Sequence, residues 1–182
     1  MKKIDQEMST LFAQRGKAMK ELNVIKLKSE AFLGNIMETD KYELVEITVD
    51  SGAGESVIPP ELMAQFGTQP TDASRSGEEY IAASGDVIQN EGERTCDVVT
   101  LEGVSRKITF QVTGVNKALL SVGRVCEKNQ AVIFTPHWSY IQCLESGEVV
   151  PLKSKNGVWV LEVWAPKTPR AVAGFTRPGG HP

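Results

Sequence analysis

The residues best suited to catalysis lie in one short segment, Asp50-Ser51-Gly52-Ala53. The β-branched run Ile47-Thr48-Val49 leads into this segment and Val57-Ile58 follows it, which indicates a buried strand that delivers Asp50 to a tight loop. An aspartate at the end of such a strand can be brought close to a second carboxylate. Two adjacent carboxylates share one proton because both cannot easily ionise, so the pair can deprotonate a water molecule while donating to a carbonyl oxygen.

A turn is the competing interpretation of the same four residues. Short Asp and Ser side chains bond their own backbone and glycine adopts positive φ, so these four residues by themselves favour a turn. Two further segments change the balance because they follow in a consistent order. Residues Tyr80 to Ile88 are typical of a hairpin with Ser84-Gly85 at its tip, and the apolar run from Ala118 ends in Val122-Gly123-Arg124.

Together the three segments resemble retropepsin-like aspartic proteases. The resemblance implies a mainly β fold, an acid-protease β barrel closed at a dimer interface, in which Asp50 is catalytic. Glycine-tipped hairpins serve as flaps in this family, and a hydrophobic strand ending in Gly-Arg passes behind the catalytic loop. The resemblance assigns Ser51, Gly52 and Ala53 to the catalytic loop, Gly54, Val57, Ile81, Ser84 and Gly85 to substrate binding, and Glu55, Gly123 and Arg124 to structural support. Apolar subsites are expected around Val57, Ile58, Ile81 and Val122.

The chain contains a single Asp-Ser/Thr-Gly motif, since Asp86 and Asp97 are each followed by valine. A two-lobed pepsin arrangement needs two copies of the motif, and 182 residues are few for two lobes. We therefore expect a homodimer with an isologous contact, in which each chain contributes one Asp50.

The resemblance extends beyond the region from Tyr42 to Lys128. The segment from Ala131 to Trp164, with Pro151-Leu152 and a hairpin at Asn156 to Leu161, is similar to the protease region of Copia-type retrotransposon polyproteins. This similarity implies a peptide or polyprotein substrate. Because the sequence lacks a cluster of metal ligands, we expect no metal or other cofactor. The sequence-based prediction is thus an aspartic endopeptidase of retroelement type that processes a polyprotein.

One departure from the family pattern concerns the residue after the motif. Retroviral members commonly carry an acidic residue there that pairs with the arginine of the second element, whereas this chain has Gly54 and only then Glu55. Two alternatives follow: Glu55 substitutes as the partner of Arg124, or the dimer contacts are weakened.

The elements that must position these residues divide the chain into three parts. Apolar residues at three- and four-residue steps predict an N-terminal helical extension over residues 1–40. A β domain is expected over 41–164, and proline and glycine predict a flexible tail over 165–182. Predicted strands cover 42–49, 80–83, 95–101, 107–112, 131–134, 139–143 and 158–164. The one helix signal in the β domain covers 122–128, ended by Asn129.

Composition limits the other functions. The net charge of −3 disfavours nucleic-acid binding by the whole chain, so RNA could be bound only through the basic ends. The sequence lacks a long apolar run and a secretory signal, so we expect an intracellular, soluble, cytoplasmic protein without membrane contact. Three cysteines without a CxxC pair suggest neither disulfides nor zinc. His137 and His181 are the only histidines, which argues against a serine-protease triad around Ser51.

Two alternatives to the protease remain open at this level. A catalytically inactive retropepsin-like domain could act in protein binding or dimerisation, with the N-terminal helix as one route. A nucleic-acid-associated piece of a mobile-element polyprotein is the third interpretation, and it rests on the basic ends of the chain.

Overall fold

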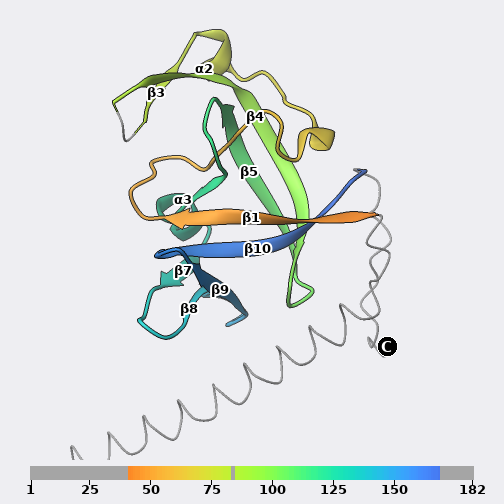
Figure 1. Ribbon diagram of the computed structural model, residues 1–182, viewed down its shortest axis with the longest axis vertical. Coiled ribbons are helices and arrows are strands. Elements are labelled where there is room, and N and C mark those ends of the chain that lie inside the picture. The colour runs from red at the N-terminus through yellow and green to blue at the C-terminus, as the bar shows by residue number, and fades with distance from the viewer. Residues whose placement is uncertain (1–40, 83–84, 169–182) are drawn as a thin grey trace, which may run out of the picture.

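The computed structural model describes residues 41–82 and 85–168, and this part of the chain is mainly β (Figure 1). The predicted N-terminal extension, Ser84 and residues 169–182 of the predicted tail lie outside the described residues. The described part of the chain forms ten strands: β1 (Tyr42–Asp50), β2 (Val57–Ile58), β3 (Glu79–Ile81), β4 (Val87–Thr100), β5 (Ser105–Thr113), β6 (Leu119–Ser121), β7 (Gln130–Ile133), β8 (Ser139–Cys143), β9 (Val149–Lys155) and β10 (Val158–Pro166).

The helical elements of the described chain are short. A 3-10 turn, η1 (Ala64–Phe66), and helix α2 (Asp72–Arg75) lie between β2 and β3, and helix α3 (Val122–Cys126) follows β6. The sequence-based prediction did not include α2, which begins with a capping box between Thr71 and Ser74. It also extended α3 too far: the helix stops at Cys126, and Asn129 has a φ of 56°.

The strands form one sheet in the order β3-β4-β5-β2-β6-β1-β10-β9-β8-β7. An additional pairing of β4 with β10 closes six of these strands, β4-β5-β2-β6-β1-β10, into a ring within one chain. The sequence-based prediction placed the closure at a dimer interface instead. The strands β7, β8 and β9 extend beyond the ring as an antiparallel sheet (Figure 1). The outer edge of β7 pairs with no other strand of the described chain.

β1 lies at the centre of this arrangement, and its side chains alternate between the core and the outside. Val45, Ile47 and Val49 are buried in the core, while the residues between them are half-buried or exposed. The strand pairs antiparallel with β10 along almost its whole length, and its last three residues pair parallel with β6. The end of β1, where Asp50 lies, is therefore held between two neighbours.

The C-terminal boundary of the domain differs from the sequence-based prediction. Ala165 and Pro166, assigned to the flexible tail, belong to β10 and pair with Glu43 and Tyr42. A proline is compatible with this position because it lies at the end of the strand, where one missing N–H interrupts little of the ladder.

A buried arginine ties the segment after β2 to the long strand β4. The Arg94 side chain is 3% exposed, and its guanidinium donates to the carbonyl oxygens of Pro60 and Leu62 and to the Thr68 hydroxyl at 2.6–2.9 Å. These hydrogen bonds to charged donors offset the cost of burying the guanidinium. The segment that follows the Asp50 loop is thereby fixed against β4.

No helix among residues 41–82 and 85–168 is long and apolar enough to cross a membrane.

A β-bulge at Asn90 to Gly92 generates the first prediction. Gly92 has a φ of 130°, and a Cβ at this position would lie 2.6 Å from the carbonyl oxygen of Gln69. Gly92→Ala should lower the free energy of unfolding by roughly 2 kcal/mol, measured by urea denaturation. Gly114→Ala is the matched control, because its Cβ would meet no atom within 4 Å, and a loss of equal size there would contradict the explanation.

Candidate active site

Asp50 is positioned by the pairing of β1 with β6. In the parallel register Asp50 lies opposite Ser121, and the Thr48 N–H donates to the Ala118 carbonyl oxygen at 3.0 Å. The Gly52 N–H donates to Asp50 Oδ1 at 2.8 Å, which closes a tight turn around the carboxylate. Asp50 is half-buried, so its carboxylate sits at the end of a core strand with access to solvent.

Ser121 holds the loop after Asp50 from behind. Its fully buried hydroxyl donates to the Ala53 carbonyl oxygen at 2.7 Å and accepts from the Arg124 N–H at 3.3 Å. The Ser121 N–H in turn donates to the Ser56 hydroxyl at 3.0 Å. One serine thus links β6, the start of α3 and the Asp50 loop.

Ser51, which the resemblance assigns to the catalytic loop, does not hold that loop through its hydroxyl. Ser51 is exposed, and its hydroxyl makes no hydrogen bond within the described chain. The buried hydroxyls of Ser56 and Ser121 take this role instead. Little water competes for the hydrogen bonds of a buried hydroxyl, so these bonds fix the backbone better than those of an exposed hydroxyl would.

Arg124 connects α3 to the same loop through its side chain. Its Nε–H donates to Glu55 Oε2 at 2.9 Å, Nη2 contacts Glu55 Oε1, and Nη1 donates to Glu127 Oε2 at 2.8 Å. Hydrogen bonds to Glu55, then to Glu127, raise the pKa of Arg124 above its already high ordinary value. Of the two alternatives left open by the sequence, the structure shows Glu55 as the partner of Arg124, one residue later than in the family pattern.

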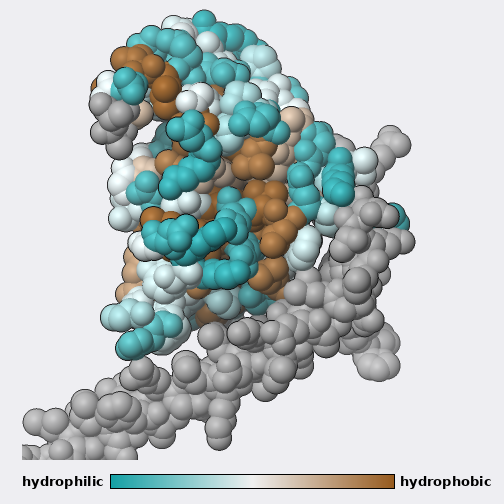
Figure 2. Space-filling view, in the orientation of Figure 1, coloured by the Kyte–Doolittle hydropathy of each residue, from teal (hydrophilic) through white to brown (hydrophobic). Residues whose placement is uncertain are grey.

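The hairpin formed by β3 and the start of β4 projects from the ring (Figure 1). Ile81 pairs with Val87, and the Gly85 N–H donates to the Ala82 carbonyl oxygen at 2.8 Å, with Gly85 at a φ of 90°. Ile81 is 79% exposed and Val87 58% exposed, and Figure 2 shows apolar surface near this end of the molecule. Exposed aliphatic side chains on a projecting hairpin are suited to cover a ligand or a second chain.

Sequence reasoning missed a polar cluster at the base of this hairpin. The buried Asn90 amide donates to the Tyr80 hydroxyl at 2.9 Å and to Gln111 Oε1 at 3.2 Å, and the Gly92 N–H donates to Asn90 Oδ1. Burial is the main cause of a raised pKa of Tyr80, and the charges of Glu78 and Glu55 raise it further. The sequence signal for this cluster was Asn90 two residues before Gly92, because at this spacing an Asn side chain can accept from the backbone N–H.

Most of the predicted site residues fall into three groups. One assembly contains the Asp50 loop and its support, comprising Asp50, Gly52, Ala53, Glu55, Gly123 and Arg124. Ile81 and Gly85 lie on the hairpin. Gly54 is exposed, with open space around the position of a Cβ.

The apolar subsite predicted around Val57 and Ile58 is wrong for Ile58. Ile58 is completely buried in the core and Val57 is 8% exposed, because β2 is enclosed between β5 and β6. Val122, by contrast, is half-buried. Little of the β2 side chains is available to a ligand in the single chain.

The comparisons with known proteins give no identification: no family model, curated protein or solved structure matches this chain.

The hydroxyl of Ser121 generates the second prediction. Ser121→Ala would leave the Ala53 carbonyl and the Arg124 N–H without their buried partner, so the free energy of unfolding should fall by about 1–3 kcal/mol. Chemical denaturation measures this loss. Ser105→Ala, at an exposed serine in β5, should change stability by less than about 0.5 kcal/mol. Equal effects of the two substitutions would show that the Ser121 hydroxyl does not support the loop.

Proposed function

We propose that this chain is an aspartic endopeptidase of retroelement type that acts as a homodimer. The observation that carries the proposal is the placement of Asp50: a carboxylate at the end of a core strand, in a tight loop held from behind by β6 and α3. The Asp-Ser-Gly-Ala sequence at this place and the projecting hairpin support the same function.

The proposed reaction uses Asp50 of two chains around a two-fold axis. One carboxylate is ionised and takes a proton from a water molecule as the water oxygen attacks the peptide carbonyl carbon. The other carboxyl group donates its proton to the carbonyl oxygen, which gives a neutral gem-diol. Collapse of the diol breaks the C–N bond as a proton passes to the nitrogen, and the pair is left sharing one proton.

One side of the molecule offers a surface on which a second copy of the chain would dock. The hairpin of β3 and β4, the end of β1 and the strand β7 lie along the same side of the molecule (Figure 1). Ile81 and Val87 expose apolar surface at one end of this side, and at the other end β7 presents an edge that pairs with no further strand of the described chain. An isologous contact here would bring the Asp50 loops of two chains toward one axis.

The proposed substrate is an extended peptide, in a polyprotein that includes this chain. Such a peptide would lie between the Asp50 loop and the hairpin, with alternate side chains facing each wall. Closure of the hairpin over it would exclude water from the carboxylates. A domain that dimerises through the same face without cleaving peptides is the alternative that the next experiment decides.

Asp50→Asn should abolish peptide cleavage while leaving the fold and the dimer intact, because the amide cannot accept the proton of the attacking water. Cleavage of a peptide library is measured by mass spectrometry, and mass by light scattering. Asp97→Asn, at a half-exposed aspartate in β4, is the matched control and should retain full activity. Residual cleavage by purified Asp50→Asn protein would show that another group performs the chemistry, and no cleavage by a wild-type dimer would favour the binding domain.

If two chains form one active site, mixtures of wild-type and variant chains should lose activity in a defined way. Excess Asp50→Asn chain mixed with wild-type chain should reduce activity below the value expected from dilution, because mixed dimers contain one carboxylate. The pH profile of wild-type kcat/KM should be bell-shaped, since the pair needs one proton and only one. Activity proportional to wild-type chain at every mixing ratio would mean that each chain acts alone.

A further inference from the structure

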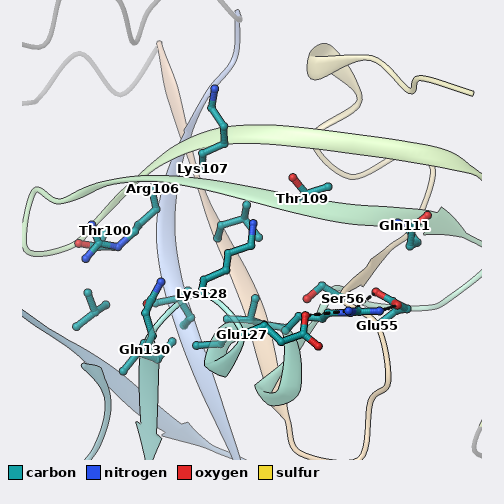
Figure 3. A pocket seen from close by; sticks show the side chains of 17 residues that line it. Glu55, Ser56, Thr100, Arg106, Lys107, Thr109, Gln111, Glu127, Lys128 and Gln130 are labelled. Carbon is teal, nitrogen blue, oxygen red and sulfur yellow. Dashed lines mark hydrogen bonds and ion pairs between the residues drawn. The ribbon is translucent and has the colours of Figure 1, made fainter. Parts of the chain in front are cut away.

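A crevice lies between α3, β5 and the strands β8 to β10 (Figure 3). We call it the α3–β5 crevice. Its volume is about 280 Å³, comparable to the smaller sites that bind organic molecules. Its apolar lining comes from six side chains of five strands and α3: Ile108, Leu120, Val125, Ile141, Val150 and Leu161.

The polar lining of the α3–β5 crevice contains side chains of both charges. Its cationic side chains are Arg106, Lys107, Arg124 and Lys128, against the carboxylates of Glu55 and Glu127. Arg124 is neutralised by both of these carboxylates, and Arg106 donates to Glu148 at 2.7 Å.

The two lysines are not neutralised to the same degree as the arginines. Lys107 is 68% exposed and lies 3.7 Å from Asp97, a long contact. Lys128 takes part in no ion pair among the described residues. Figure 3 shows its side chain extending from the end of α3 toward β5, across the crevice. Lys128 is therefore the cation best placed to meet a bound anion.

We propose that the α3–β5 crevice binds a small organic anion with an apolar body, such as an aryl sulfonate or a medium-chain carboxylate. The apolar body would displace water from the aliphatic lining, which is the main source of binding free energy. The anionic group would lie at Lys128, which no carboxylate of the described chain satisfies. An inorganic anion would not use the lining, and a neutral apolar molecule would not use the lysine.

The crevice also borders the support of the Asp50 loop. Glu55, Ser56 and Arg124 line it, and the same three residues hold the loop and the start of α3. A bound anion would thus contact the back of the loop without entering the space beside Asp50. Binding at this place does not require that Asp50 be catalytic, so the inference is separate from the proposed function.

The test is a fluorescence titration of the full chain with 8-anilinonaphthalene-1-sulfonate, in the absence of any peptide. N-phenyl-1-naphthylamine, the same ring system without the sulfonate, is titrated in parallel. Lys128→Glu should weaken binding of the sulfonate roughly tenfold, because an attraction becomes a repulsion, and change binding of the neutral probe by less than about twofold. Ile108→Phe should weaken both probes, because a larger side chain occupies the crevice.

Lys117→Glu is the matched charge reversal, at an exposed lysine that does not line the crevice, and it should leave both probes unchanged. Equal weakening of the sulfonate by Lys117→Glu and Lys128→Glu would overturn the proposal, as would unchanged binding in Lys128→Glu. Loss of the dimer in Lys128→Glu with unchanged sulfonate binding would assign the crevice to a second chain instead. If Ile108→Phe does not melt cooperatively like wild type, Lys128→Glu and the neutral probe decide alone.

Discussion

The rest of the site depends on the parallel pairing of β6 with the end of β1. This pairing puts the buried Ser121 opposite Asp50, where one hydroxyl binds the loop carbonyl of Ala53 and the first turn of α3. A short loop rich in glycine would otherwise sample many conformations. Because Ser121 is enclosed by the core, its hydrogen bonds do not exchange readily with water, and they hold the backbone of the loop after Asp50.

The hairpin base and the Asp50 loop are joined by a continuous series of hydrogen bonds. Tyr80 accepts from Asn90, Asn90 donates to Gln111, and the Gln111 N–H donates to the Ser56 carbonyl oxygen. Ser56 then accepts from Ser121 through its hydroxyl. The position of the hairpin is thus tied to the Asp50 loop, and the bulge between Asn90 and Gly92 lies in β4 at the hairpin base.

α3 contributes both to the support of the Asp50 loop and to the α3–β5 crevice. Arg124 leaves the start of α3 and binds Glu55, which fixes the loop of Asp50, while Lys128 beyond its end reaches across an apolar crevice. Because one short helix borders both places, a ligand in the crevice would contact the same ion pair that supports the carboxylate. The two proposals therefore concern neighbouring parts of one structure, although each rests on its own observations.

Local patterns in the sequence were enough for some features of this protein. Alternation of apolar residues predicted β1, β5 and β8 within a residue or two, and the Asp-Ser-Gly-Ala segment located the loop, because strand periodicity and turn chemistry act over a few neighbours. Contacts between distant segments were decided only by the tertiary structure. Four features depend on such contacts: the pairing of β4 with β10, the burial of Ile58, the support of the loop by Ser121 instead of Ser51, and the ion pair of Glu55 with Arg124. No local pattern relates the residues involved, since chain folding alone sets which strands become neighbours.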